Sequence, residues 1–294
     1  MKFLKLSLII SIGLLSSFPL AGFAASGIGL SPAKMEVSLE PGQQVGKEIT
    51  VINSTDRSLV FNVEIQDFIG GDSPTSPTKI ITDKSSPYSL RDYLSISGNN
   101  LHFILPSGGK RSVPFTIKLP GDIAGGGYYA GILFSSTDLA TSSIKVTTRL
   151  GALIFVRVPG QVSTRGETKE FGLRLDKDSS IPTFDILFEN QGEMHLNPYG
   201  YISIRNWWGK EIDFINIKPW FVMPHSQRMI SIASDKPFQS GWYRVTLKLN
   251  RGYEDTIDTL TTSVTIWTWW LIALVVVLVV IVWWLIHHYL WRRN

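Results

Sequence analysis

Apolar and polar residues alternate with a period of two along most of the chain between residues 35 and 265, and this pattern constrains the fold more than any other feature. The alternation is clearest in seven segments: 59–66, 101–105, 113–119, 150–158, 184–188, 243–249 and 260–266. Successive side chains of a strand point to opposite faces, so each segment can bury one face. Turn-forming pairs such as Pro41-Gly42 and Pro120-Gly121 separate the segments. Together these signals predict an all-β chain built from immunoglobulin-like β-sandwiches.

The stretch from Pro159 to Thr168 (PGQVSTRGET) lacks this alternation and is rich in polar and turn-forming residues. Such a composition is typical of a boundary between domains. It predicts a first sandwich over residues 25–160 and a second over residues 161–266. Residues 69–87 contain several Gly, Pro, Ser and Thr residues and predict a long surface loop. Only Ser89 to Leu94 indicates a short helical turn.

The first 24 residues have the pattern of a secretory signal peptide. Lys2 and Lys5 form a positive start, and an apolar run follows from Leu6 to Leu15. Gly22 and Ala24 are small residues that fit a cleavage site before Ala25. The alternative is an uncleaved membrane anchor, but the apolar run is short for a span of about 20 residues.

Residues 267–286 (WTWWLIALVVVLVVIVWWLI) carry no formal charge and predict a transmembrane helix. At 1.5 Å per residue such a helix covers about 30 Å, which matches the hydrocarbon thickness of a bilayer. Its two borders carry a predicted aromatic belt of Trp267, Trp269, Trp270, Trp283 and Trp284. The positive-inside rule places Arg292 and Arg293, and with them a tail over residues 287–294, in the cytoplasm. The prediction is a single-pass protein of the cell membrane with its ectodomain outside. A buried strand is the alternative, but strands rarely run this long.

Charge excludes one class of partner. Four of the 28 basic residues lie in the two ends, so residues 25–266 contain 24 basic and 24 acidic residues. Nucleic-acid binding needs clustered Lys and Arg, and a neutral ectodomain does not predict it.

The chain also has no cysteine, which excludes disulfides, thiolate metal sites and cysteine catalysis.

No motif in the sequence predicts an enzyme or a cofactor. Ser107–Ser112 resembles part of a phosphate loop but lacks its first glycine and its Ser/Thr, and Gly125–Gly127 precedes no helix. The acidic turns Asp176–Asp178 and Glu254–Asp258 hold too few ligands to predict a calcium site. A Ser-His-Asp triad leaves no local signature, because its members can lie far apart in the sequence. The ectodomain has three histidines, none in a recognisable catalytic context: His102, His195 and His225.

Two pairs of adjacent aromatic residues are candidate binding positions. Trp207 and Trp208, next to Gly209, would point to opposite faces of a strand, so one of them would face solvent and could anchor a partner. The alternative is that they cap the end of the sandwich near the membrane. Tyr128 and Tyr129 have the same geometry and are candidates for contact with a glycan. The alternative for this pair is one core tyrosine and one edge tyrosine.

Several stretches together are similar to one known family. Gly126–Phe134 (GGYYAGILF), followed by Arg149–Gly151 and Val156–Gly160, resembles the end of the first extracellular domain of WxL-interacting proteins. Pro41–Gln43 and Val51–Asn53 resemble its start. The second half of the chain carries two more similar stretches, Phe188–Gly200 and Met223–Arg228. The order of signal, two sandwiches, helix and basic tail is also the same.

The resemblance implies a bacterial cell-surface protein whose first domain contacts peptidoglycan and whose second domain holds a surface protein that carries a WxL domain. With the predicted anchor, it leads to a non-enzymatic scaffold that tethers a surface protein, peptidoglycan or both at the membrane. The alternative is an exported assembly factor or chaperone that acts by β-strand addition, which requires an exposed edge strand. A third possibility, an accessory subunit of a membrane complex, has no helix-pairing motif to support it.

Overall fold

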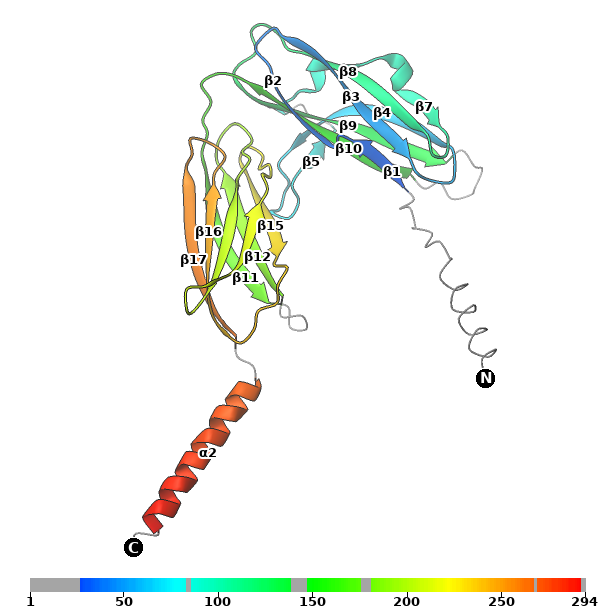
Figure 1. Ribbon diagram of the computed structural model, residues 1–294. Helices are drawn as coiled ribbons and strands as arrows, with labels where there is room; N and C mark the ends of the chain where they lie inside the picture. The colour runs from blue at the N-terminus through cyan, green and yellow to red at the C-terminus, as the bar shows by residue number, and fades with distance from the viewer. Residues whose placement is uncertain (1–26, 83–85, 139–146, 176–180, 267–268, 292–294) are drawn as a thin grey trace, which may run out of the picture.

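The computed structural model describes residues 27–82, 86–138, 147–175, 181–266 and 269–291 (Figure 1). The predicted signal peptide, Trp267 and the terminal pair Arg292 and Arg293 lie outside the described residues. Figure 1 shows two β-sandwiches that meet at an angle, with one helix leaving the second sandwich at the end far from the first. The chain is therefore mostly β, as the alternation predicts.

The first sandwich packs two sheets face to face. One has four strands in the order β1-β3-β8-β6, and the other has the order β2-β10-β9-β4-β5, with β7 also paired to β4. The strands are β1 (Ile28–Ser31), β2 (Lys34–Ser38), β3 (Gln44–Asn53), β4 (Leu59–Ile69), β5 (Lys79–Ile81), β6 (Leu94–Ile96), β7 (His102–Leu105), β8 (Lys110–Lys118), β9 (Gly126–Asp138) and β10 (Thr147–Val158). The first strands change sheets, because β1 pairs with β3 while β2 pairs in parallel with β10.

The core of the first sandwich follows the alternation of its strands. On β10, the side chains of Ala152, Ile154 and Val156 are fully buried, while Arg157 on the opposite face is exposed. Phe61 on β4 is also fully buried and stacks on Phe103. Burial of such residues, at about 25 cal/mol per Å² of apolar surface, is the main force that holds the two sheets together.

The second sandwich is smaller. A three-stranded sheet in the order β11-β12-β15 faces a four-stranded sheet in the order β14-β13-β16-β17. The strands are β11 (Gly166–Leu175), β12 (Pro182–Asn190), β13 (Tyr199–Asn206), β14 (Glu211–Ile217), β15 (Ser226–Ala233), β16 (Gly241–Asn250) and β17 (Ile257–Ile266). The alternating residues of β12 and β16 meet in the core, where six are fully buried: Phe184, Ile186, Phe188, Val245, Leu247 and Leu249. No strand is assigned between Val158 and Gly166, within the predicted boundary.

Residues 69–87 differ from the prediction of a surface loop. Part of the segment forms β5, which pairs with the end of β4. Another part reaches the second domain, where the carbonyl oxygen of Pro74 accepts a hydrogen bond from the backbone N–H of Met229 at 2.8 Å. The Gly and Pro residues therefore form turns that fold the segment against both domains. The predicted helical turn nearby is a single 3₁₀ turn, η2 (Arg91–Tyr93).

Helix α2 (Trp269–Trp291) occupies the C-terminal region where the sequence predicts a membrane span. It differs from the predicted 267–286 because it continues through His287 and His288 to Trp291, since no helix-breaking residue intervenes. Within the described residues, no helix is found that is long and apolar enough to cross a membrane. The predicted span is thus not confirmed. The side chains of the first six positions of the predicted span, which include Trp269 and Trp270, lie outside the described residues.

Candidate functional site

A small buried cluster joins the two sandwiches. Tyr129 on β9, Phe155 on β10 and Phe68 on β4 come from the first domain, and Met223 comes from the segment before β15 in the second. The ring centroids of Tyr129 and Phe155 are 5.5 Å apart in an edge-to-face arrangement, which is favourable for aromatic pairs. The two domains therefore share apolar contacts that favour one relative orientation.

Hydrogen bonds around His195 continue this junction. The hydroxyl oxygen of Tyr129 accepts a hydrogen bond from the backbone N–H of His195 at 2.8 Å and lies 3.1 Å from Nδ1 of the same residue. The hydroxyl proton is then free for donation to Nδ1, which assigns the imidazole proton to Nε2. Nε2 lies 3.4 Å from Oε1 of Glu36 on β2. One chain of polar groups thus links both domains.

The surroundings of these groups set their protonation. Burial lowers the pKa of His195, so the imidazole is neutral in the folded protein. The contact with His195, together with Lys34 and Asn197, holds the pKa of Glu36 far below its ordinary value. Burial raises the pKa of Tyr129. The junction therefore contains a neutral tyrosine, a neutral histidine and a charged carboxylate.

A cleft of about 350 Å³ opens beside this junction, between the two domains. It is lined by residues of β2 and β10, among them Glu36, Ser38 and Arg157, and by His195 of the second domain. Within the described part of the chain, no group of three or more His, Asp or Glu side chains could hold a metal ion. The cleft offers charged and hydrogen-bonding groups next to strand β10.

Strand β10 has one edge that is only half covered. Leu153 donates its backbone N–H to Ala33, and Arg157 accepts from Leu39, so the odd-numbered residues of β10 turn their backbone groups toward β2. The pairing with β2 starts at Leu153, whereas β10 starts at Thr147. The pairing of β10 with β9 has no bulge from Thr147 to Val158, so the odd-numbered residues face the same edge along the whole strand. The backbone groups of Thr147, Arg149 and Gly151 therefore point outward, without a hydrogen-bond partner among the described residues.

Two edge strands of the second domain are protected instead. On β11, the backbone N–H of Gly166 donates to the hydroxyl oxygen of Tyr253 at 3.0 Å, and that of Thr168 donates to Oδ2 of Asp258 at 2.9 Å. On β15, Met229 donates to the loop of the first domain described above. Covering an edge in this way prevents unwanted pairing with other chains. The open part of β10 thus differs from both.

The tyrosines predicted as glycan contacts are not exposed. Tyr129 is fully buried in the junction between the domains. Tyr128 is half-buried, packs edge-on against Tyr93 and donates its hydroxyl proton to the carbonyl of Ala124. The expectation that one of the pair faces solvent is therefore not met, and their contact with a glycan stays a prediction. The outer face of β9 at this point is covered by the second domain, which sequence alone does not reveal.

Trp207 and Trp208 are both exposed, at 61% and 74% of their surface. They lie in the turn between β13 and β14, not on a strand, and their ring centroids are 3.7 Å apart. The expectation that they point to opposite faces fails because β13 already ends at Asn206. Asn206 pairs with Tyr243 beside the start of β16, and β16 begins opposite Ile266. The two indoles therefore lie at the end of the sheet from which the chain continues toward α2.

The other predicted positions lie on α2 or beyond the described residues. Trp283 and Trp284 are exposed, and their rings contact those of His287 and His288 one turn later. None of the predicted site residues lies in the cleft or on the open edge of β10. Sequence reasoning missed Glu36 and Arg157, because an exposed charge on a strand carries no local signal of its role.

No protein-family model matches the chain, and no curated protein matches it. Similar solved structures include the class 5 fimbriae chaperone CfaA, with 14% identity and a TM-score of 0.38 over 82% of this chain and 100% of that one. The E. coli chaperone DraB has 13% identity and a TM-score of 0.35 over 82% and 99%. The CsuC–CsuE chaperone–tip adhesion subunit complex of Acinetobacter baumannii has 9% identity and a TM-score of 0.39 over 80% of this chain and 98% of that one. At these identities the likeness is one of fold alone.

Proposed function

We propose that this protein is a non-enzymatic binding protein that captures an extended segment of an exported protein as an added strand on the open edge of β10. The observation that carries the proposal is the outward direction of the backbone groups of Thr147, Arg149 and Gly151, which have no partner among the described residues. In β-strand addition, such main-chain groups supply the affinity and nearby pockets supply the specificity. This function is the assembly-factor alternative of the sequence analysis.

The surroundings of the edge support a short ligand segment. The open stretch runs from Thr147 to Ala152, where the start of the β2 pairing at Leu153 would stop an added strand. Six residues at about 3.3 Å each give a seat roughly 20 Å long. Leu150 is half-buried in this stretch and offers an apolar contact to the incoming strand.

A proline substitution tests the proposal at one backbone group. Arg149→Pro removes an outward N–H and leaves the ladder with β9 in place, since proline is tolerated on an edge whose N–H faces solvent. Arg149→Ala is the matched control, because it removes the side-chain contact with Glu64 but keeps the N–H. Full-length protein in detergent would be incubated with an array of overlapping peptides from the exported proteins of its source cell. We expect some peptides to bind wild type and Arg149→Ala with similar affinity and to bind Arg149→Pro at least tenfold more weakly. If no peptide in the array distinguishes Arg149→Pro from Arg149→Ala, the proposal is contradicted.

Tethering at the cell membrane is the second candidate function, and one observation favours it. From Leu274 to Ile286 the side chains of α2 are apolar and exposed on every face, for example Val279 at 62% and Trp283 at 65%. A helix that is apolar all round requires an apolar environment. We propose that α2 anchors the protein with its ectodomain outside and its tail in the cytoplasm, and that the resemblance to WxL-interacting proteins extends to a surface-protein or peptidoglycan partner.

The anchor is tested by fractionation and by protease. Wild-type protein should stay with membranes after a carbonate wash, whereas Val277→Lys/Val280→Lys should be released. Protease added to intact cells should digest the two sandwiches and spare the tail; recovery of wild type in the carbonate wash would overturn the anchor. Purified cell-wall sacculi separate the two candidate functions: retention on sacculi favours tethering, and retention only on exported unfolded subunits favours strand addition.

A further inference from the structure

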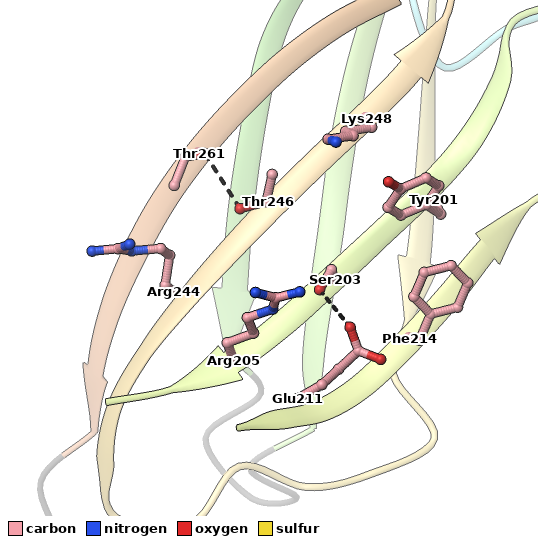
Figure 2. A pocket seen from close by; sticks show the side chains of 9 residues that line it. All are labelled: Tyr201, Ser203, Arg205, Glu211, Phe214, Arg244, Thr246, Lys248 and Thr261. Carbon is pink, nitrogen blue, oxygen red and sulfur yellow. Dashed lines mark hydrogen bonds between the residues drawn. The ribbon is translucent and has the colours of Figure 1, made fainter. Parts of the chain in front are cut away.

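The outer face of the β14-β13-β16-β17 sheet carries a groove of about 600 Å³ (Figure 2). Its side chains come from all four strands, because outward residues of neighbouring strands stand side by side on one face of a sheet. The groove is on the second domain, away from the open edge of β10. Its volume is within the range of about 300–1,000 Å³ that is usual for small-ligand sites.

Three cations line the groove. Arg205 on β13 lies between Arg244 on β16 and Glu211 on β14, and Lys248 follows on the same face of β16. All three side chains are exposed, and none forms an ion pair within the described residues. Like charges that face each other across two strands are destabilising. Glu211 offsets only part of this repulsion, so the lining keeps a net positive charge that an anionic ligand would neutralise.

The groove has one carboxylate, and it is engaged by a neighbour. Oε2 of Glu211 accepts a hydrogen bond from the hydroxyl of Ser203 at 2.9 Å, as Figure 2 shows. The lining thus holds three positive charges against one negative charge. Thr246 and Thr261 add two hydroxyl groups, whose oxygens are 3.3 Å apart. Donors and acceptors both face the space between the cations.

An aromatic pair forms one side of the groove. The rings of Tyr201 and Phe214 stack with centroids 4.9 Å apart and an angle of 29° between their planes. Phe214 is 45% exposed, so part of its ring is open to the groove. An exposed ring face beside hydroxyls and cations is suited to a ligand with one apolar face and several polar groups.

We propose that this groove binds an acidic polysaccharide. The flat C–H face of a sugar ring would pack on the Tyr201–Phe214 pair, its hydroxyls would meet Ser203 and Thr246, and Arg205 and Arg244 would hold its carboxylate or phosphate group. Arginine suits this role because its planar fork binds both anions with two hydrogen bonds. A small free anion would have no use for the aromatic pair, and a nucleic acid would require a wider basic surface than three cations.

Binding of defined polysaccharides to full-length protein in detergent tests the proposal. The probes are oligogalacturonate, which carries carboxylates on its sugar rings, phosphomannan, which carries phosphates on its sugar rings, and neutral dextran. We expect at least one acidic probe to bind and dextran not to bind. Arg205→Gln/Arg244→Gln should lower that binding at least tenfold, and Lys110→Gln/Lys118→Gln, which removes two exposed charges from the first domain, should leave it unchanged.

The aromatic pair provides a second, independent readout. Phe214→Ala should weaken binding of the same probe about fivefold or more, whereas Phe214→Trp, which keeps a ring, should retain it. Three results would overturn the proposal: no acidic probe binds, both double variants lose binding equally, or anionic lipid vesicles bind with the same dependence on the two arginines. Arg149→Pro should not affect this binding, so its outcome is separate from that of the proposed function.

Discussion

The hydroxyl of Tyr129 links the two domains through two hydrogen bonds to His195. It accepts from the backbone N–H and donates to Nδ1 of the ring, and both residues are buried. A buried donor or acceptor that loses its partner costs about 1–3 kcal/mol. A single oxygen atom therefore contributes to the fixed orientation of the domains.

Removal of this hydroxyl tests its role. Tyr129→Phe should lower the free energy of unfolding by about 2 kcal/mol, because two buried groups of His195 lose their partner. Tyr128→Phe is the matched control and should cost less than about 1 kcal/mol, since its hydroxyl makes one exposed contact with Ala124. Denaturant titration of both variants measures the difference. Equal losses would contradict the assignment.

His195 also makes stability depend on pH. Its pKa is lowered in the folded state, so below the ordinary value of about 6.5 the unfolded chain takes up a proton that the folded chain does not. Stability should therefore fall as the pH drops from about 6.5 to 5, and fall further below about 4.5 because Glu36 also has a lowered pKa. His195→Gln should flatten the first part of this curve, and His102→Gln, at an exposed position, should not. Parallel curves for all three proteins would exclude His195 as the source.

Sequence reasoning at this scale placed Tyr128 and Tyr129 correctly as neighbours on a strand but wrongly as candidates for exposure. The period-two pattern says which residues share a face, and it does not say whether that face meets solvent or another domain. His195 lies 66 positions beyond Tyr129, so nothing local links the two. The turn at Trp207 and Trp208 was missed because aromatic residues favour strands.

At the scale of single elements, the close approach of β16 backbone to strand β13 leaves no room for a side chain at Gly200. A Cβ atom built there would lie 2.0 Å from the carbonyl oxygen of Lys248 on β16. This neighbour is backbone, so it could move only if the ladder of the sheet moved with it. The same two strands carry the cations of the groove, whose spacing therefore depends on this contact.

The close approach predicts a specific sensitivity to substitution. Gly200→Ala should lower the free energy of unfolding by about 1–3 kcal/mol, because the added methyl group forces the strands apart. Gly172→Ala on β11 is the matched control, since a Cβ there meets nothing within 4 Å. Thermal unfolding of the two variants gives the comparison. An unchanged midpoint for Gly200→Ala would show that the ladder adapts without strain.

Elements were predicted well where one face is buried and the other is solvated. Phe184, Ile186 and Phe188 alternate in the sequence and are all buried in the second core. Strand β14 follows the alternation less clearly, because Phe214 points outward toward the groove. Strand β5 was missed because it has three residues and lies in a segment rich in turn formers. Short edge strands carry too few alternating positions to stand out.

At the scale of the whole molecule, the two sandwiches place three surfaces apart from one another. The open edge of β10 is on the first domain, the basic groove is on the second, and α2 leaves the second domain at its far end (Figure 1). The order of two β-sandwiches could be predicted from alternation and turns. The open edge could not, because it depends on where β2 stops pairing with β10, and that register is set by contacts distant in sequence.

Site-directed cross-linking in cells that make the protein tests strand addition at β10 most directly. The chain has no cysteine, so a cysteine introduced at Thr147 or Arg149 is the only site for a thiol-reactive photo-cross-linker. Ser95→Cys on edge strand β6 is the control within the same domain. We predict that both β10 positions yield the same exported proteins, identified by mass spectrometry, and that Ser95→Cys does not. Cross-links of equal yield and composition at all three positions, or none at β10, would contradict the account.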